Sequence, residues 1–244
     1  MQISLKHGFA FLCTPKCASN SIEDMLRPYI DLDFQGAPSV RHTNVRLYRR
    51  YVLPYLSTVA PEVHIETFAL VREPVSWLHS WYRFRARSAL RSQKHANSTA
   101  HVSFAEFIEA YLSDPQPEFA QVGTQADFLL DEEGNPGVDR LYAYENVQGL
   151  VDELALRMGR SLTLRAINVS PGKVHRSNLL ERLDALQRRI RSRLVRKGQV
   201  ARPPARAPVL GLDAALSAAL SEKLGRDFEL YRSAIASRAA AAST

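Results

Sequence analysis

The chain has few cysteines, no long apolar run and, near its start, a long stretch without glycine. Its two cysteines, Cys13 and Cys17, have no further Cys or His close enough in sequence to suggest a zinc site. Two cysteines exclude a disulfide-rich scaffold, and buried free thiols are expected in preference to one short-range disulfide. No apolar run approaches the ~18–20 residues of a membrane span, and the N-terminus lacks the pattern of a signal peptide. A cytoplasmic protein is therefore the simplest expectation.

The composition is that of a globular protein with a basic surplus. The 244 residues are 45% hydrophobic and 23% charged, which suits one α/β domain with embellishments or two small domains. We expect a single domain over residues 1–244. The 32 basic and 25 acidic residues give a net charge of +7, which favours an anionic partner. Nucleic acid, an acidic membrane face, a polyanionic sugar and a doubly phosphorylated nucleotide all satisfy that preference.

Two apolar runs that each end close to a proline predict buried strands followed by loops. These runs are residues 8–14 and 66–71. A helix is expected after each run, capped in the first case by Ser19 or Asn20 and opened in the second by Pro74. Strand–loop–helix units joined by crossovers predict an α/β fold with a central, mostly parallel sheet flanked by helices. Ligands of such folds bind at the carboxyl ends of the strands, so both loops are expected on one edge.

Weaker patterns predict the remaining elements. Helices are expected at about residues 44–55, 103–112, 146–158, 179–194 and 212–237, and short strands at 128–130, 138–144 and 162–169. The helix at 103–112 begins with a capping-box pattern formed by Ser103 and Glu106. The region at about 177–210 combines a very basic amphipathic helix with a proline-rich linker.

The first loop, residues 14–21, has the chemistry of an anion-binding helix start. The first N–H groups of a helix have no intrahelical partner and lie at the positive end of the helix dipole, so they bind phosphate or sulfate readily. Lys16 adds a cation, and Ser19, Asn20 and Ser21 add short hydrogen-bond donors. A routine helix start with a surface lysine is the alternative interpretation.

The absence of glycine from this loop separates it from the loops that bind nucleoside triphosphates. Walker A requires Gly-x-x-x-x-Gly-Lys-Ser/Thr, and no glycine lies between Gly8 and Gly36. An ordinary nucleoside triphosphatase is therefore disfavoured.

The second loop places an arginine at a strand end and a serine in the helix that follows. Ser80 comes eight residues after Arg72, close to a whole number of helical turns, so it is expected to face the start of the helix. A guanidinium group with a hydroxyl makes a good clamp for a phosphate monoester. The alternative is a surface ion pair between Arg72 and Glu73 beside a buried serine.

Taken together, the two loops resemble the nucleotide-dependent sulfotransferases, in particular the carbohydrate sulfotransferases and their bacterial relatives. That family carries Pro-Lys-x-x-x-x-Ser/Thr after its first strand and Arg-Asp/Glu-Pro-x-x-x-x-x-Ser-x-Tyr after a later one. The chain has the first motif at residues 15–21 and the second at residues 72–82. Weaker similarities follow in family order at residues 124–128, 144–147, 167–170 and 227–231. The resemblance covers about residues 8–172 and 212–232, and implies a sulfotransferase fold that is similar to the P-loop NTPase fold.

The resemblance implies that 3′-phosphoadenosine 5′-phosphosulfate is the sulfuryl donor. The 5′-phosphosulfate would lie on the first loop, formed by Pro15, Lys16, Cys17, Ala18, Ser19, Asn20 and Ser21. Arg72 and Ser80 would hold the 3′-phosphate, and Ser170 and Lys173 would close over the nucleotide. The first loop departs from many members of the family, which have small Gly/Thr residues where this chain has residues 17–20. Lys16 would also stabilise the charge that develops on the leaving phosphate.

In-line transfer to a hydroxyl also requires a general base, for which histidine is well suited. The first candidate is His42, because carbohydrate sulfotransferases of this type often place a histidine between the two phosphate motifs. His64, His79 and Glu23 are the alternatives. No metal is expected. The acceptor is expected to be a hydroxyl of a carbohydrate or glycolipid, although peptide and phenolic hydroxyls stay open, as does the oligomeric state.

Two rival functions and one accessory surface follow from the same residues. A small-molecule kinase would need a magnesium ligand and a better triphosphate loop, and it would label its product from labelled adenosine triphosphate. A nucleic-acid-binding module would use the basic helix, but no recognised motif supports it, and no nucleic-acid partner is expected. The basic residues at 182–197 are either a solvated face or a site of contact with the acceptor or a membrane surface.

Overall fold

A five-stranded mixed sheet forms the centre of the fold in the computed structural model, which describes residues 1–87, 96–165 and 212–241. The strands are β1 (Gln2–Ser4), β2 (Phe9–Leu12), β3 (Leu32–Asp33), β4 (Glu66–Val71) and β5 (Arg140–Ala143). They lie in the order β3-β1-β2-β4-β5. The pairs β2–β4 and β4–β5 are parallel, whereas β1 is antiparallel to both β2 and β3. The α/β class is therefore confirmed, but the expectation of a mostly parallel sheet is wrong.

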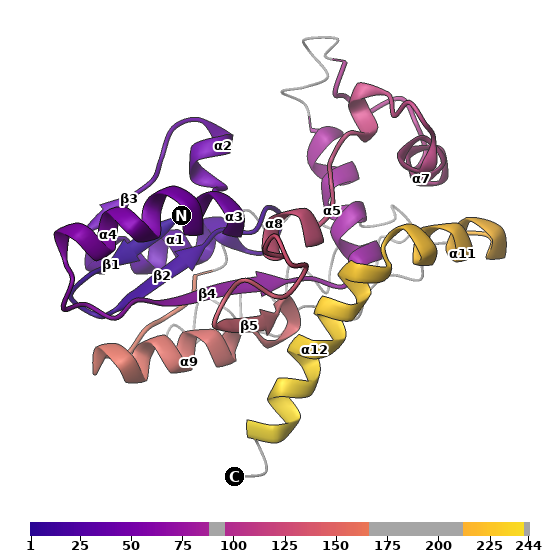
Figure 1. Cartoon of the computed structure of the whole chain (residues 1–244). Helices are drawn as coiled ribbons and strands as arrows, with labels where there is room; N and C mark the ends of the chain where they lie inside the picture. The colour runs from indigo at the N-terminus through magenta and orange to yellow at the C-terminus, as the bar shows by residue number, and fades with distance from the viewer. Residues whose placement is uncertain (88–95, 166–211, 242–244) are drawn as a thin grey trace, which may run out of the picture.

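Helices cover both faces of the sheet (Figure 1). The helices near the first loop are α1 (Ser19–Leu26), η1 (Arg27–Tyr29), α2 (Pro38–Arg41), α3 (Val45–Leu47), the π-helical turn η2 (Tyr48–Val52) and α4 (Leu53–Val59). The helices that follow are α5 (Pro74–Arg85), α7 (Phe104–Leu112), η3 (Glu118–Ala120), α8 (Ala126–Leu129), η4 (Tyr144–Asn146), α9 (Val147–Met158), α11 (Ala214–Lys223) and α12 (Gly225–Ala241).

Several weaker expectations are corrected. Residues 128–130 were expected in a strand, but Phe128 and Leu129 lie in α8, and Leu130 forms only an isolated bridge with Pro136. Residues 162–165, expected to begin another strand, form no regular element. The last predicted helix is two helices that meet at Leu224. The basic segment, the proline-rich linker, and the candidate residues Ser170 and Lys173 lie outside the described residues.

The alternation of side chains along β2 and β4 divides the core between the two faces of the sheet. Phe9 and Phe11 lie in one cluster with residues of α1, α5 and α9. Ala10 and Leu12 face the other cluster, to which α3, α4, α8 and α12 contribute. All four residues of β2 are fully buried, which explains why this strand is a continuous apolar run in the sequence.

The parallel strands bring their carboxyl ends to one edge of the sheet. Figure 1 shows the arrowheads of β2, β4 and β5 pointing toward that edge, next to α5 and α8. The helix α5 begins there with Pro74 at its first turn, and the Glu73 carboxylate accepts hydrogen bonds from the N–H groups of Val75 and Ser76. Glu73 is thus a helix cap, and the surface pair with Arg72, which was the alternative interpretation of the second loop, is not formed.

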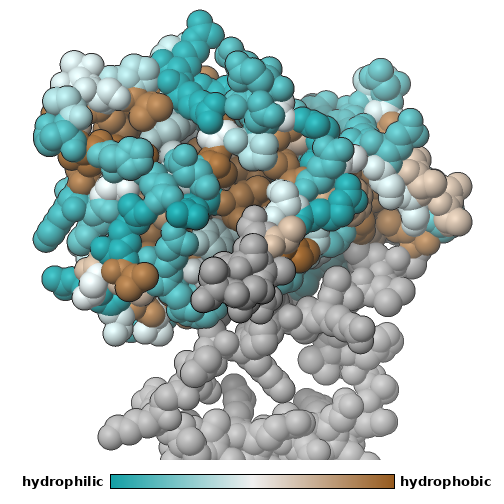
Figure 2. Space-filling view, turned by 60° about the horizontal axis from the view of Figure 1, so that its bottom comes forward, coloured by the Kyte–Doolittle hydropathy of each residue, from teal (hydrophilic) through white to brown (hydrophobic). Residues whose placement is uncertain are grey.

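The outer surface is mixed in character. Figure 2 shows hydrophilic side chains over most of one face, with hydrophobic side chains gathered near its middle. Within the described ranges, none of the helices combines the length and the hydropathy needed to cross a membrane.

Candidate functional site

The loop between β2 and α1 is held in a conformation that non-glycine residues rarely adopt. Lys16 and Ala18 have φ values of 65° and 57°, in the left-handed region. Such positions cost about 1–3 kcal/mol each and are typical of ligand-binding loops. Ala18 precedes the helix without a side-chain cap, so the expected caps are wrong. The Ser19 hydroxyl instead donates to the Thr14 carbonyl oxygen at 2.8 Å and closes the loop on itself.

Other residues of this loop are fixed by contacts to neighbouring elements. The Trp77 indole N–H of α5 donates to the Pro15 carbonyl oxygen at 2.8 Å. The Cys17 thiol is fully buried, and both cysteines are free, as predicted. The Asn20 side-chain oxygen accepts a hydrogen bond from Arg41. The loop is therefore rigidly supported, which preorganises its backbone N–H groups.

Lys16 extends from this loop to the aromatic side chains of α5. Its Nζ lies 4.1 Å from the ring centroid of Phe84 and 5.6 Å from that of Trp81. Burial, followed by the nearby charges of Arg87 and Arg72, lowers the pKa of Lys16 to about 8. Lys16 has no ion pair with any described carboxylate. Its positive charge is therefore poorly stabilised by the protein and would gain from an anion.

Arg72 joins the second loop to the first. Its Nη1 donates to the Lys16 carbonyl oxygen at 3.4 Å, and its guanidinium carbon lies 4.6 Å from the ring centroid of Tyr144. Its Nε donates to the Ser76 hydroxyl at 2.9 Å, one turn before the predicted partner Ser80. Ser80 is partly buried on the same helix, and its role as a phosphate ligand stays a prediction. The two loops nevertheless meet, as their position on the sheet edge predicted.

Gln125, which sequence reasoning did not single out, holds the two loops in register. Its amide is fully buried and binds the backbone of Arg72 twice, accepting from the N–H and donating to the carbonyl oxygen, both at 2.8 Å. The Cys17 thiol donates to the same side-chain oxygen at 3.5 Å. The backbone N–H of Gln125 donates to the carboxylate of Asp227 in α12 at 2.9 Å. Burial raises the pKa of Asp227 to about 6.

Replacing Gln125 by leucine should destabilise the fold because it leaves the buried N–H and C=O groups of Arg72 without partners. Each unsatisfied group costs about 1–3 kcal/mol, so for two groups we expect the free energy of unfolding to fall by about 2–6 kcal/mol in denaturant titration. The matched control is Gln148→Leu, since Gln148 is exposed and its amide donates to Asp152 at the surface of the same helix. Its effect should stay within about 0.5 kcal/mol. Equal losses in both variants would contradict the bridging role.

His42 lies beside the end of β2, where the first loop begins. Its Nδ1 is 2.6 Å from the Cys13 carbonyl oxygen. A carbonyl can only accept, so this contact assigns the proton to Nδ1 and leaves Nε2 as an acceptor. Burial lowers the pKa of His42 below its usual value. The imidazole is therefore held neutral, with one basic nitrogen that has no hydrogen-bond partner among the described residues.

The alternative bases are placed less favourably. Glu23 is buried and engaged by Arg41 and by the Cys13 thiol, which donates to it at 3.1 Å. His79 lies in α5 against the rings of Tyr82 and Phe104. His64 is exposed. Of the four candidates, His42 alone combines contact with the loop and a free acceptor nitrogen.

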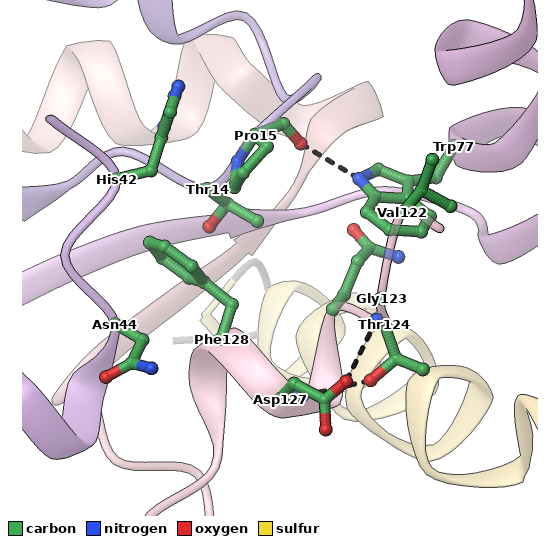
Figure 3. Close-up of a pocket in the computed structure, with 11 residues that line it drawn as sticks. Thr14, Pro15, His42, Asn44, Trp77, Val122, Gly123, Thr124, Asp127 and Phe128 are labelled. Atoms are coloured by element: carbon green, nitrogen blue, oxygen red, sulfur yellow. Dashed lines mark hydrogen bonds between the residues drawn. The ribbon is translucent and has the colours of Figure 1, made fainter. Parts of the chain in front are cut away.

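A cavity of about 210 Å³ lies between the first loop and residues 122–128. Figure 3 shows Thr14 and Pro15 on one side and Thr124, Asp127 and Phe128 on the other, with the ring of His42 at the rim directed away from Asp127. Thr14 is 1% exposed, and its hydroxyl has no hydrogen-bond partner in the part of the chain that the structure describes. A buried hydroxyl without a partner at a cavity wall is a donor or acceptor available to a ligand.

The site thus combines the first loop, Lys16, Arg72 and His42, which were predicted, with Ser76, Gln125 and Tyr144, which were not. Ser76 could have been found, because it lies at the i+4 position from Arg72. Gln125 carried only the weak similarity at residues 124–128, and its role depends on contacts over 53 and 102 residues. No group of His, Cys, Asp or Glu suited to a metal ion is found in the part of the chain that the structure describes. Comparison with protein-family models, with curated proteins and with solved structures found no match to this chain.

Proposed function

We propose that the chain is a sulfotransferase that moves a sulfuryl group from 3′-phosphoadenosine 5′-phosphosulfate to an acceptor hydroxyl. The observation that carries the proposal is the junction of the two loops, where Arg72 donates to the Lys16 carbonyl. The charge of Arg72 also contributes to the lowered pKa of Lys16, and neither side chain has a carboxylate partner among the described residues. A nucleotide with phosphate groups at both its 3′ and 5′ positions is a ligand that such a pair of loops suits.

The hydrogen-bond donors and cations of the two loops fit this nucleotide. The left-handed residues Lys16 and Ala18 lie directly before the first turn of α1, and the start of a helix favours phosphate or sulfate oxygens. Arg72 provides a guanidinium group that suits phosphate geometry, with Ser76 beside it and Ser80 one turn further along α5. The ring of Tyr144 next to Arg72 adds an apolar surface.

In this proposal Lys16 and His42 have separate roles in the transfer reaction. Lys16 stabilises the negative charge that develops on the leaving 5′-phosphate. His42 accepts the proton of the attacking hydroxyl at Nε2 while Cys13 holds its Nδ1. The cavity beside His42 receives the acceptor, which we propose is a carbohydrate or glycolipid hydroxyl. The sulfuryl group passes directly from the nucleotide to the acceptor hydroxyl, so no covalent enzyme intermediate is required.

Calorimetric titration tests the nucleotide assignment directly. We expect adenosine 3′,5′-bisphosphate to bind at least about tenfold more tightly than adenosine 5′-monophosphate, since a charge-assisted contact contributes about 1.5–3 kcal/mol. Arg72→Ala should remove most of that preference by weakening the bisphosphate selectively. Arg226→Ala is the control, because Arg226 is exposed and binds Glu229 and Gly134 away from both loops. Equal affinity of the unmodified protein for the two nucleotides would refute the proposal.

A further inference from the structure

The helical segment that follows the candidate base carries an unusual concentration of exposed apolar side chains. Six of the nine large hydrophobic residues that are exposed in the described ranges lie within residues 40–59: Val40, Leu47, Tyr51, Leu53, Tyr55 and Val59. Isolated exposed apolar residues are ordinary, but a cluster of this kind marks an interaction surface. The proposed transfer chemistry uses none of these six side chains.

Four of these side chains form one stripe. Leu47, Tyr51, Tyr55 and Val59 are spaced by four residues along α3, η2 and α4, so they lie on one side of the helical segment. Their exposed fractions are 44%, 60%, 60% and 53%. The opposite side of the segment is buried through Val45, Tyr48 and Leu56. We call these four residues the tyrosine face.

The π-helical turn explains how the stripe stays aligned. Pro54 has no N–H group to bond the carbonyl of Arg50, and its ring would clash with that carbonyl in a regular α-helix. The wider turn of η2 removes this conflict, and the N–H of Leu53 bonds to Tyr48 five residues back. A π turn contains more than four residues, so residues four apart stay on nearly the same side of the helix through η2. The side chains of the stripe therefore remain on the exposed side.

The segment that carries the tyrosine face has charged side chains of one sign only. Residues 40–61 contain four arginines and no Asp or Glu. Arg41 and Arg49 are paired with Glu23 and Asp131. Arg46 and Arg50 are exposed and have no carboxylate partner among the described residues.

We propose that the tyrosine face docks on an anionic membrane surface. An exposed helical stripe of tyrosine and aliphatic side chains, flanked by two arginines without a carboxylate partner among the described residues, has the composition of a helix that lies in the headgroup region. Four side chains are far fewer than the 20–30 residues a side of a stable protein interface, which disfavours a second copy as the occupant. The same helical segment begins at Asn44, a residue that lines the cavity, so docking would bring the cavity close to the bilayer.

Vesicle co-sedimentation of the full chain tests this docking. We expect binding to vesicles with about 30% phosphatidylglycerol, little binding to pure phosphatidylcholine, and weaker binding as salt rises. The double variant Tyr51→Ser/Tyr55→Ser should bind anionic vesicles at least about tenfold more weakly. The matched control Leu156→Ser/Ile235→Ser removes two exposed apolar side chains elsewhere and should bind like the unmodified chain.

Three outcomes would overturn the docking proposal. The first is no binding of the unmodified chain to either vesicle, and the second is full binding by the Tyr51→Ser/Tyr55→Ser variant. The third is a change in oligomeric state, measured by light scattering, that appears in the tyrosine variant while vesicle binding is retained. That result would identify the tyrosine face as a contact between copies. Nucleotide titration of the same variants separates this test from the proposed transfer activity, because the tyrosine face does not include the phosphate loops.

Discussion

Lys16→Met should abolish most sulfuryl transfer while leaving the protein folded. Removing one group that stabilises developing charge costs about 10²–10³ in turnover, and we expect a loss of that size in single-turnover transfer from the labelled donor. Burial and the charges of Arg87 and Arg72 already lower the pKa of Lys16 to about 8, so the ammonium group is stabilised poorly in the free protein. Methionine should therefore leave the free energy of unfolding at least as high as before. Loss of both stability and turnover would contradict this assignment.

The pH dependence of nucleotide binding gives a second test of the role of the Lys16 charge. The charged form predominates below about pH 8 and is lost above it, so affinity for adenosine 3′,5′-bisphosphate should be level up to about pH 8 and then fall. Lys16→Arg keeps its charge throughout this range and should remove the fall, although the guanidinium group restores turnover incompletely. Lys223→Met is the control, since Lys223 also lies over an aromatic ring, that of Tyr111, but belongs to neither loop. A fall that persists in Lys16→Arg would assign the titration to another group.

Local sequence patterns predicted the parts of the fold that depend on neighbouring residues. The apolar runs at β2 and β4, the proline start of α5, and the capping box of Ser103 and Glu106 were each expected, and each is found. These predictions were correct because strand burial and helix capping depend on signals within a few neighbouring residues. The strands β1 and β3 were missed because they have only three and two residues. Their pairing is determined by contact with the rest of the sheet.

The residues of the site that belong to sequence motifs could be predicted. Those whose role depends on contacts with distant parts of the chain could not. Proline, lysine and arginine at strand ends indicated both loops before their positions were known. The left-handed conformation of Ala18 has no local signal, because alanine ordinarily avoids it. Gln125 looks like any polar residue in sequence, and its importance depends on burial against Arg72 and Asp227. The role of such residues can be recognised only in the tertiary structure.

His42→Ala should lower turnover strongly and leave nucleotide binding unchanged. A general base contributes about 10²–10⁴ in rate, and the cavity-side position of His42 lies outside the Lys16–Arg72 junction that would hold the phosphates. We therefore expect a loss of at least about 100-fold in turnover with an affinity for adenosine 3′,5′-bisphosphate within about twofold. His64→Ala is the control because His64 is exposed, and it should transfer normally.

The pH profile distinguishes a base from a residue that only supports the loop. Burial lowers the pKa of His42, so its neutral form persists to more acidic pH than a free imidazole would allow. Turnover should therefore stay level as the pH falls through the usual histidine range, and decline only below it. In His42→Ala this acid limb should disappear, since the group that titrates is gone, while the alkaline limb from Lys16 remains. If His42→Ala kept the acid limb at reduced amplitude, the base would be another residue and His42 would serve to position the Cys13 carbonyl at the start of the loop.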